Sequence, residues 1–199
     1  MMSAQSSMSV YLNWAKERLH EMDAALDALD IKAAEAEAAS KVKTAEIMAD
    51  LKKRRSDLET LLKTQAAAGD AALAQAKTEL DQHWAGFEAQ MKTYFDTAGQ
   101  QAVQQQAIFK DIAAAQAKAW HEAADRFREA ASAGGANVET VLDQLKSDAT
   151  QAGAHLDKLK QAGSESWSVL SAALSESRKA FDQANQAAWN ALKGSGPKS

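Results

Sequence analysis

Two short motifs place histidine and glutamate at spacings that metal sites use. Glu17 and His20 lie three residues apart in ERLH, as the ligands of a carboxylate-bridged di-iron helix do. Such a site needs a second Glu-x-x-His motif and two more inward-facing glutamates, and the sequence holds no second copy of the motif. We therefore favour a solvated flank of a helix seam for Glu17 and His20, with the di-iron site as the alternative.

The remaining histidines give little support for chemistry. His121 and Glu122 begin HEAAD like a zinc-protease motif, but Asp125 stands where the second histidine would be, and His83 and His155 are isolated. The chain has no cysteine, which excludes disulfides, thiolate catalysis and Cys-ligated zinc. No serine is paired with a histidine and an acid in a nucleophile motif. We expect no catalytic, cofactor-binding or metal-binding residue, and a protein that is not an enzyme.

The composition indicates long helices. Of the 199 residues 46% are hydrophobic, and many of these are alanine, which favours helices but buries little area. The net charge of −4 argues against nucleic-acid binding by the whole chain. The first residues lack the features of a secretory signal, and no stretch approaches the ~20 apolar residues of a membrane span. We expect a soluble, cytoplasmic protein without a transmembrane segment.

Apolar residues recur every three or four positions, which is typical of helices that pack as coiled coils. Turns expected at Gly69 and at Gly134 divide this pattern into three segments of similar length. The sequence therefore predicts an all-α fold, an elongated antiparallel bundle of three long helices with coiled-coil packing. The predicted helices cover residues 8–68, 70–132 and 137–192, within a single domain over 1–193 and before a flexible tail over 194–199.

Three segments poor in large side chains bear on this prediction. They are KAAEAEA (32–38), GQQAVQQQ (99–106) and GSESWSV (163–169). Three helices of about 80–90 Å would bring these segments side by side as a thin middle of the bundle. Helix breaks at Gly99 or Gly163 are the alternative, and we favour continuity at Gly99.

Four consecutive cations, Lys52, Lys53, Arg54 and Arg55, are candidates for a contact with anionic lipid or a partner. Consecutive residues spread around a helix, however, and do not form one patch. We favour a solvated helix face for this run, with surface or partner contact as the alternative.

The five tryptophans divide into two groups. Trp84, Trp120 and Trp167 lie in or beside the apolar stripe and are expected to anchor the core. Trp14 and Trp189 are displaced from the stripe. We favour burial in an oligomer or at an edge for these two, and keep contact with a membrane or granule surface as the alternative.

Parts of the chain resemble known families. Over residues 11–95, the stretches YLNWAKERLHEMDAALDAL, KAAEAEAASK, ADLKKRRSDLETLL and LDQHWAGFEAQM are similar to small bacterial coiled-coil proteins labelled stress-response proteins. The stretch AGSESWSVLSAALSESRKAFDQANQAAWNAL (162–192) is similar to the C-terminal part of that family and also to phasins, which coat polyhydroxyalkanoate granules. The first resemblance implies a coiled-coil fold without established chemistry, and the second implies a granule-coating role.

These observations lead to three function classes. We favour a non-enzymatic coiled-coil structural or stress-associated interaction protein, which binds a protein partner or itself through its helices. The alternative is a phasin-like amphipathic coat on a lipid or polyester granule surface. A metalloenzyme is the third class. No cofactor and no nucleic-acid partner is expected.

Overall fold

A computed structural model describes residues 2–33, 38–65, 73–98, 102–133, 138–162 and 165–194. Over these ranges the chain forms six α-helices and no strand, which confirms the all-α prediction. The helices are α1 (Met2–Ala33), α2 (Ala38–Gln65), α3 (Leu73–Ala98), α4 (Ala102–Ala133), α5 (Glu139–Ala162) and α6 (Trp167–Gly194).

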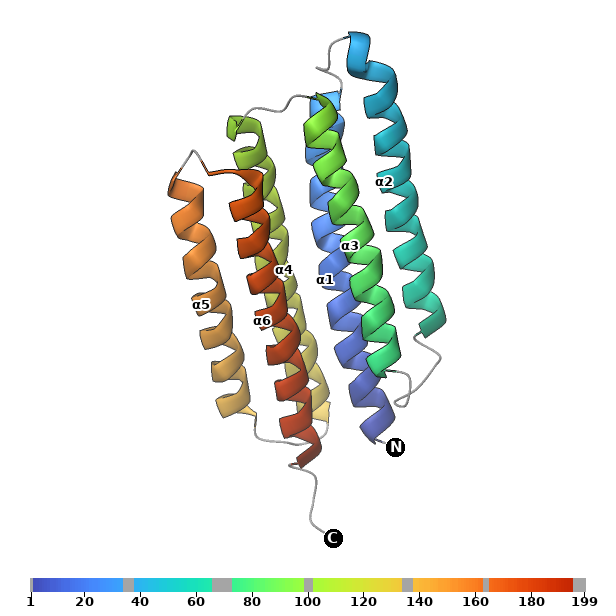
Figure 1. The fold of residues 1–199 in the computed structure, drawn as a ribbon. Helices are drawn as coiled ribbons and strands as arrows, with labels where there is room; N and C mark the ends of the chain where they lie inside the picture. The colour runs from blue at the N-terminus through green and yellow to red at the C-terminus, as the bar shows by residue number, and fades with distance from the viewer. Residues whose placement is uncertain are drawn as a thin grey trace.

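The prediction of three long helices is wrong. Each predicted helix is replaced by two observed ones, and Figure 1 shows that successive helices run in opposite directions. The longest helices have 32 residues and the shortest has 24. A helix of that greatest length spans about 48 Å, roughly half the length expected for the long rods. Over the residues that the structure describes, the fold is therefore a bundle of six antiparallel helices, and the elongated three-helix rod is rejected.

The segments expected to form a thin middle coincide with helix ends. Helix α1 ends at Ala33, α3 ends at Ala98 and α5 ends at Ala162. Figure 1 shows these three ends at the same end of the molecule, where α2, α4 and α6 begin. Because alanine and glutamine bury little apolar area, this arrangement leaves the larger side chains for the core. The glycines at 69, 99, 134 and 163, and the tail from residue 195, lie outside the described residues.

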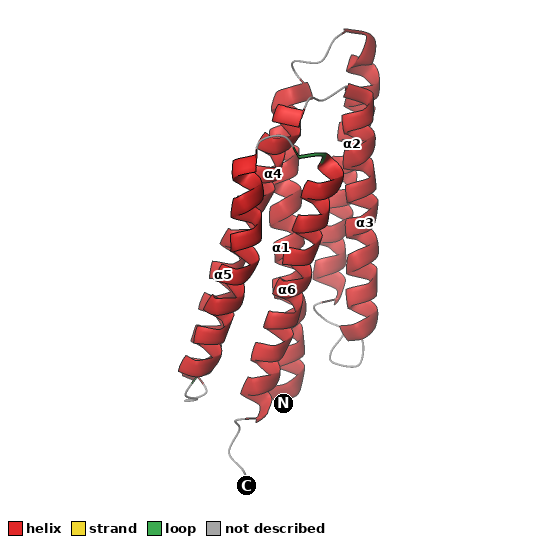
Figure 2. Cartoon of the chain, turned by 60° about the vertical axis from the view of Figure 1, so that its left-hand side comes forward, coloured by secondary structure: helices red, strands yellow, loops and turns green. Residues whose placement is uncertain are grey.

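Helix α1 is the centre of the arrangement, because it packs against α2, α3, α4 and α6. Its most extensive contact is with α4, which also packs against α5 and α6. Figures 1 and 2 show α2 and α5 on opposite sides of the molecule, with the other four helices between them. The fold can be described as two successive three-helix units, α1–α3 and α4–α6, joined mainly along α1 and α4.

Aromatic side chains fill the core between these helices. Trp120 of α4 packs edge-to-face on Phe181 of α6, with ring centroids 5.1 Å apart, and Phe127 packs on Trp189 in the same way at 5.4 Å. Such edge-to-face pairs add stability beyond the area they bury. Aromatic pairs therefore hold α4 and α6 together at two levels of the core. Among the described helices, none is long and apolar enough to cross a membrane.

Candidate functional site, a buried charge network shared by four helices

The structure brings together one residue from each of the two metal-like motifs and places the other two elsewhere. His20 of α1 lies beside Glu122 of α4, with 2.7 Å between Nε2 and Oε2, at a partly exposed position. Glu17 is buried, whereas His121 is exposed. Nowhere in the described ranges do three or more His, Asp or Glu side chains form a group that could hold a metal ion. Glu17 is thus not on a solvated flank, which corrects that interpretation for this residue.

Glu17 instead belongs to a group of buried charged side chains around Arg18. Arg18 Nη1 donates to Glu17 Oε2 at 3.0 Å and to Asp182 Oδ1 at 2.5 Å, and Nη2 donates to Asp182 Oδ2 at 2.6 Å. A longer bond of 3.3 Å joins Arg18 Nη2 to Asp81 of α3. Arg18 and Glu17 are each only 1% exposed, and Asp182 is 4% exposed. A guanidinium of α1 is therefore enclosed by carboxylates of α1, α3 and α6.

A second ion pair lies one helical turn further along α1. Arg178 of α6 binds Glu21 in a two-pronged arrangement, with Nε to Oε2 at 2.7 Å and Nη2 to Oε1 at 2.9 Å. Gln116 of α4 donates from Nε2 to the same Glu21 Oε1 at 2.9 Å and to the carbonyl of Leu174 at 3.0 Å. The Arg178 guanidinium also lies over the ring of Trp84 of α3, 4.1 Å from its centroid. These contacts extend the network to α3 and α4.

The network has balanced charge when Glu17 carries a proton. Burial raises the pKa of Glu17 well above its usual value, and the neighbouring carboxylate of Glu21 raises it further. Burial alone would also raise the pKa of Glu21, but the charge of Arg178 outweighs this effect and the pKa of Glu21 is lowered. With Glu17 neutral, Arg18 and Arg178 face the carboxylates of Glu21 and Asp182. Two buried positive charges then meet two buried negative charges.

Hydrogen bonds made by Asn13 continue the network toward the start of α1. Asn13 Nδ2 donates to Asn185 Oδ1 at 3.0 Å, and Asn185 Nδ2 donates to the carbonyl of Phe181 at 2.9 Å. Arg126 of α4 donates from Nε to Asn13 Oδ1 at 2.6 Å. The polar contacts thus follow α1 for several turns. They join it to α4 and α6 in a fixed register.

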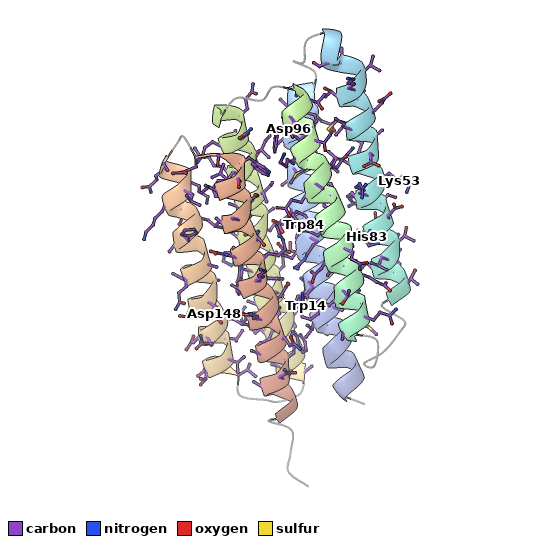
Figure 3. The ribbon with its side chains drawn as sticks, viewed as in Figure 1. Trp14, Lys53, His83, Trp84, Asp96 and Asp148 are labelled. Atoms are coloured by element: carbon purple, nitrogen blue, oxygen red, sulfur yellow. The ribbon has the colours of Figure 1, made fainter. Side chains whose placement is uncertain are left out.

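Trp14 and Trp189 are core residues in this structure. Trp14 is 1% exposed and donates from Nε1 to the carbonyl of Asp182 at 3.1 Å, and Trp189 is 4% exposed. Figure 3 shows Trp14 and Trp84 in the middle of the molecule. Their displacement from the stripe therefore does not place them at the surface, because α1 and α6 bury more than one face. A surface or partner contact by Trp14 or Trp189 stays a prediction that requires the bundle to open.

The four cations of α2 are engaged with carboxylates. Lys52 pairs with Asp30 at 3.1 Å and Arg55 with Asp23 at 2.8 Å, so that both reach α1. Within α2, Lys53 pairs with Asp57 and Arg54 with Asp50, both at 2.7 Å. Figure 3 shows Lys53 at the outer margin of the bundle. This arrangement favours the solvated-face interpretation, and a lipid or partner contact by Lys52, Lys53, Arg54 and Arg55 stays a prediction.

Sequence reasoning missed the network because its members are far apart in the chain. Arg178 and Asp182 lie four residues apart on α6, on either side of the buried Phe181. Glu17 and Glu21 have the same spacing on α1. Charged residues at a spacing of four, beside apolar residues that belong to the stripe, were the available signal. This spacing indicates buried ion pairs only when α1 and α6 are known to lie side by side.

The network can fix the relative positions of four helices. A shift of α1 against α6 would leave a buried charge without its partner, which costs far more than the loss of an exposed ion pair. Its buried charged groups, Glu17, Arg18, Glu21, Arg178 and Asp182, are directed at one another inside the core. Known protein families, characterised proteins and solved structures give no match to this chain.

Proposed function

We propose that the protein is a non-enzymatic helical-bundle protein that acts as a structural or interaction partner, as its resemblance to the stress-response coiled-coil family implies. The buried charge network carries this proposal. Glu17, Arg18, Glu21, Arg178 and Asp182 are the groups best suited to chemistry, and all five are at most 5% exposed. Their contacts hold helices in register, which is the best established role of buried polar groups in helical assemblies.

The surface of the bundle supports an interaction role. The exposed faces carry many ion pairs within single helices, such as Lys92 with Asp96 at 3.0 Å and Lys160 with Asp157 at 3.0 Å. Such pairs add little stability but present regularly alternating charge to a partner. A protein partner, or a second copy of the chain, would then bind to the folded bundle without opening it.

A coat on a lipid or polyester surface is the second candidate, and the attachment of α5 favours it. Leu142, Leu145 and Leu156 of α5 are buried against the rest of the bundle. Between Leu145 and Leu156 the helix carries Ala149 and Gly153, and both border a pocket. Because this middle part buries little apolar area, α5 is a suitable element to detach and turn its leucines toward an apolar surface.

Flotation of the full chain with phosphatidylcholine liposomes and with polyester granules separates the two candidates. The structural proposal expects the protein to stay unbound, with unchanged amide hydrogen exchange in α5. The coat proposal expects flotation, together with faster exchange of α5 amides at the moment of binding. Tryptophan emission is a weak reporter here, because all five tryptophans are at most 8% exposed in the closed bundle.

A matched pair of variants sharpens this test. Arg178→Met weakens the network, and Arg128→Met removes a half-exposed arginine that pairs with Asp125 within α4. If a coat requires an open bundle, Arg178→Met should float more than wild type, because a less stable closed state is easier to convert. Arg128→Met should behave as wild type. Flotation of the wild-type protein, increased by Arg178→Met alone, would reject the structural proposal in favour of the coat.

A further inference from the structure

The ion pairs of the network lie across the boundary between the two three-helix units. Within α1–α3, and likewise within α4–α6, each helix packs against both of the others. The main contacts between the two units are those of α1 with α4 and with α6. The pairs Arg18 with Asp182 and Glu21 with Arg178 both join α1 to α6. Buried charges therefore connect two units that each have internal packing of their own.

Buried hydrogen bonds cross the same boundary. Trp14 of α1 donates from Nε1 to the carbonyl of Asp182, and Asn13 donates to Asn185 of α6. Gln116 of α4 donates to Glu21 of α1 at 2.9 Å. Water can hydrate polar groups of this kind when they become exposed. This boundary is therefore less costly to open than a wholly apolar one of the same area.

Two carboxyl groups of α1 meet within this boundary. Glu17 and Glu21 are hydrogen-bonded to each other through their side chains, and they are 1% and 0% exposed. A hydrogen bond between two carboxyl groups requires a proton on one of them. Both oxygens of Glu21 accept from Arg178, whereas Glu17 Oε1 receives no hydrogen bond from any residue that the structure describes. A proton on Glu17 satisfies that oxygen and supplies the donor, so Glu17 is the group that carries it.

The charges around Glu17 balance only while this proton is present. Arg18 and Arg178 are matched by the carboxylates of Glu21 and Asp182. The other charged groups on the surrounding helices largely pair among themselves. These pairs are Lys77 with Asp81 on α3, Glu122 of α4 with His20, Lys118 and Arg126, and Arg55 of α2 with Asp23. Glu88 of α3 is the remaining carboxyl group close to Glu21 and Arg178.

We propose that the proton between Glu17 and Glu21 holds the two three-helix units together, and that its loss to solvent opens the boundary between α1 and the helices α4 and α6. Without this proton three buried carboxylates face two guanidinium groups, and a buried charge without a counter-charge is strongly unfavourable. Opening hydrates the extra charge, while α1–α3 and α4–α6 keep their internal packing. The closed form is favoured at low pH and the open form at high pH, because ionisation of Glu17 increases with pH. This inference does not depend on the function proposed above.

Distance measurement by double electron–electron resonance on the full chain tests this opening. The chain has no cysteine, so nitroxide labels can be attached through Ser56→Cys on α2 and Ser147→Cys on α5. Both serines are exposed, and Figures 1 and 2 show α2 and α5 on opposite sides of the molecule. The label distance should lengthen by about 10 Å, the spacing of one helix layer, from about pH 6 to about pH 10. Helicity measured by circular dichroism should stay unchanged.

An unchanged label distance would overturn the proposal. A loss of helicity that accompanies the longer distance would overturn it as well, because the proton would then control unfolding of the whole bundle and not the boundary between its units.

Three variants identify the group that titrates. Glu17→Gln keeps this position neutral at every pH, so its label distance should stay short, and Glu17→Met serves if the glutamine variant does not fold. Glu88→Gln is the matched control, because Glu88 is partly buried near Arg178 and burial raises its pKa too. This variant should open as wild type does. Opening of folded Glu17→Gln, or a lost response in Glu88→Gln, would assign the pH dependence to another group and reject the proposal.

Discussion

Helices α2 and α5 occupy equivalent places in the two three-helix units, but they are held in different ways. Helix α2 buries Ile47, Met48, Leu51 and Leu58 along its length. Helix α5 buries Leu142, Leu145 and Leu156, and its wide interval between Leu145 and Leu156 lies beside the pocket. An outer helix of this fold can therefore be attached by buried side chains along its length, as α2 is, or mainly by side chains near its ends, as α5 is.

Polar contacts strengthen the contrast. Arg55 and Lys52 of α2 form ion pairs with Asp23 and Asp30 of α1. The end of α5 receives a hydrogen bond at its Leu159 carbonyl from Gln106 of α4, at 2.7 Å. Contacts with ionised side chains on both partners depend on salt, whereas this neutral bond does not. The two outer helices should thus respond differently to changes in the core and in the solvent.

The largest effect should come from the network that lies between the outer helices. Arg178→Met leaves Glu21 buried without its ionic partner, which typically costs about 3–5 kcal/mol. Urea unfolding should show this loss for the whole bundle, because α1 and α6 support both outer helices. Arg128→Met, at an exposed pair, should change the free energy of unfolding by less than about 1 kcal/mol. Equal effects of the two substitutions would mean that the network does not hold the bundle together.

Truncation of one leucine on each outer helix tests the comparison directly. Leu51→Ala in α2 should cost about 3–4 kcal/mol, because Leu51 is fully buried among packed neighbours. Leu156→Ala in α5 should cost only about 1–2 kcal/mol, because this side chain already borders the pocket and has fewer contacts to lose. Denaturant unfolding of both variants measures the difference. The reverse order would contradict the weaker attachment of α5.

Glu17→Gln should remove a pH dependence of the free energy of unfolding that comes from the protonation of Glu17. Since the pKa of Glu17 is raised in the folded state, the folded protein keeps a proton that the unfolded chain releases near pH 4.5. Its contribution to stability is complete below that pH and is lost as the pH rises through the folded pKa. The variant should therefore be more stable than wild type at high pH.

Thermal melts of wild type and Glu17→Gln over a pH series measure this difference. The gap between the two proteins should widen as the pH rises from 4.5 and then become constant. Glutamine is neutral and can donate a hydrogen bond to Glu21, so it is a good mimic of protonated Glu17. A constant gap at all pH values would show that the pKa of Glu17 is the same in the folded and unfolded states.

The smallest expected effect comes from two glycines inside helices. A Cβ on Gly86 of α3 would lie 2.5 Å from Nη1 of Arg54 of α2, whereas a Cβ on Gly153 of α5 meets nothing within 4 Å. Gly153→Ala should stabilise the protein by about 1 kcal/mol through helix propensity. Gly86→Ala should gain less, because the arginine must move. Chemical denaturation measures the free energy of unfolding of both variants. A larger gain for Gly86→Ala than for Gly153→Ala would contradict the prediction.

The sequence was sufficient for the all-α class and for most of the core, because heptad spacing reports which residues are buried. It was not sufficient for the division between α1 and α2, since KAAEAEA (32–38) is rich in helix-forming residues and carries no glycine or proline. The sequence also did not predict the charge network, because Arg178 and Glu21 become partners only after α6 is placed on α1.

The long sequence separation within the network has a consequence for the order of folding. Glu21 and Arg178 are 157 residues apart, and Arg18 and Asp182 are 164 apart. During synthesis α1 emerges first, and the partners of Arg18 and Glu21 on α6 emerge last. Helices α2 and α3 can pack on α1 before that, but the buried ion pairs with Asp182 and Arg178 cannot form until α6 is made. The helix at the centre of the bundle is thus the first to be made and among the last to complete its contacts.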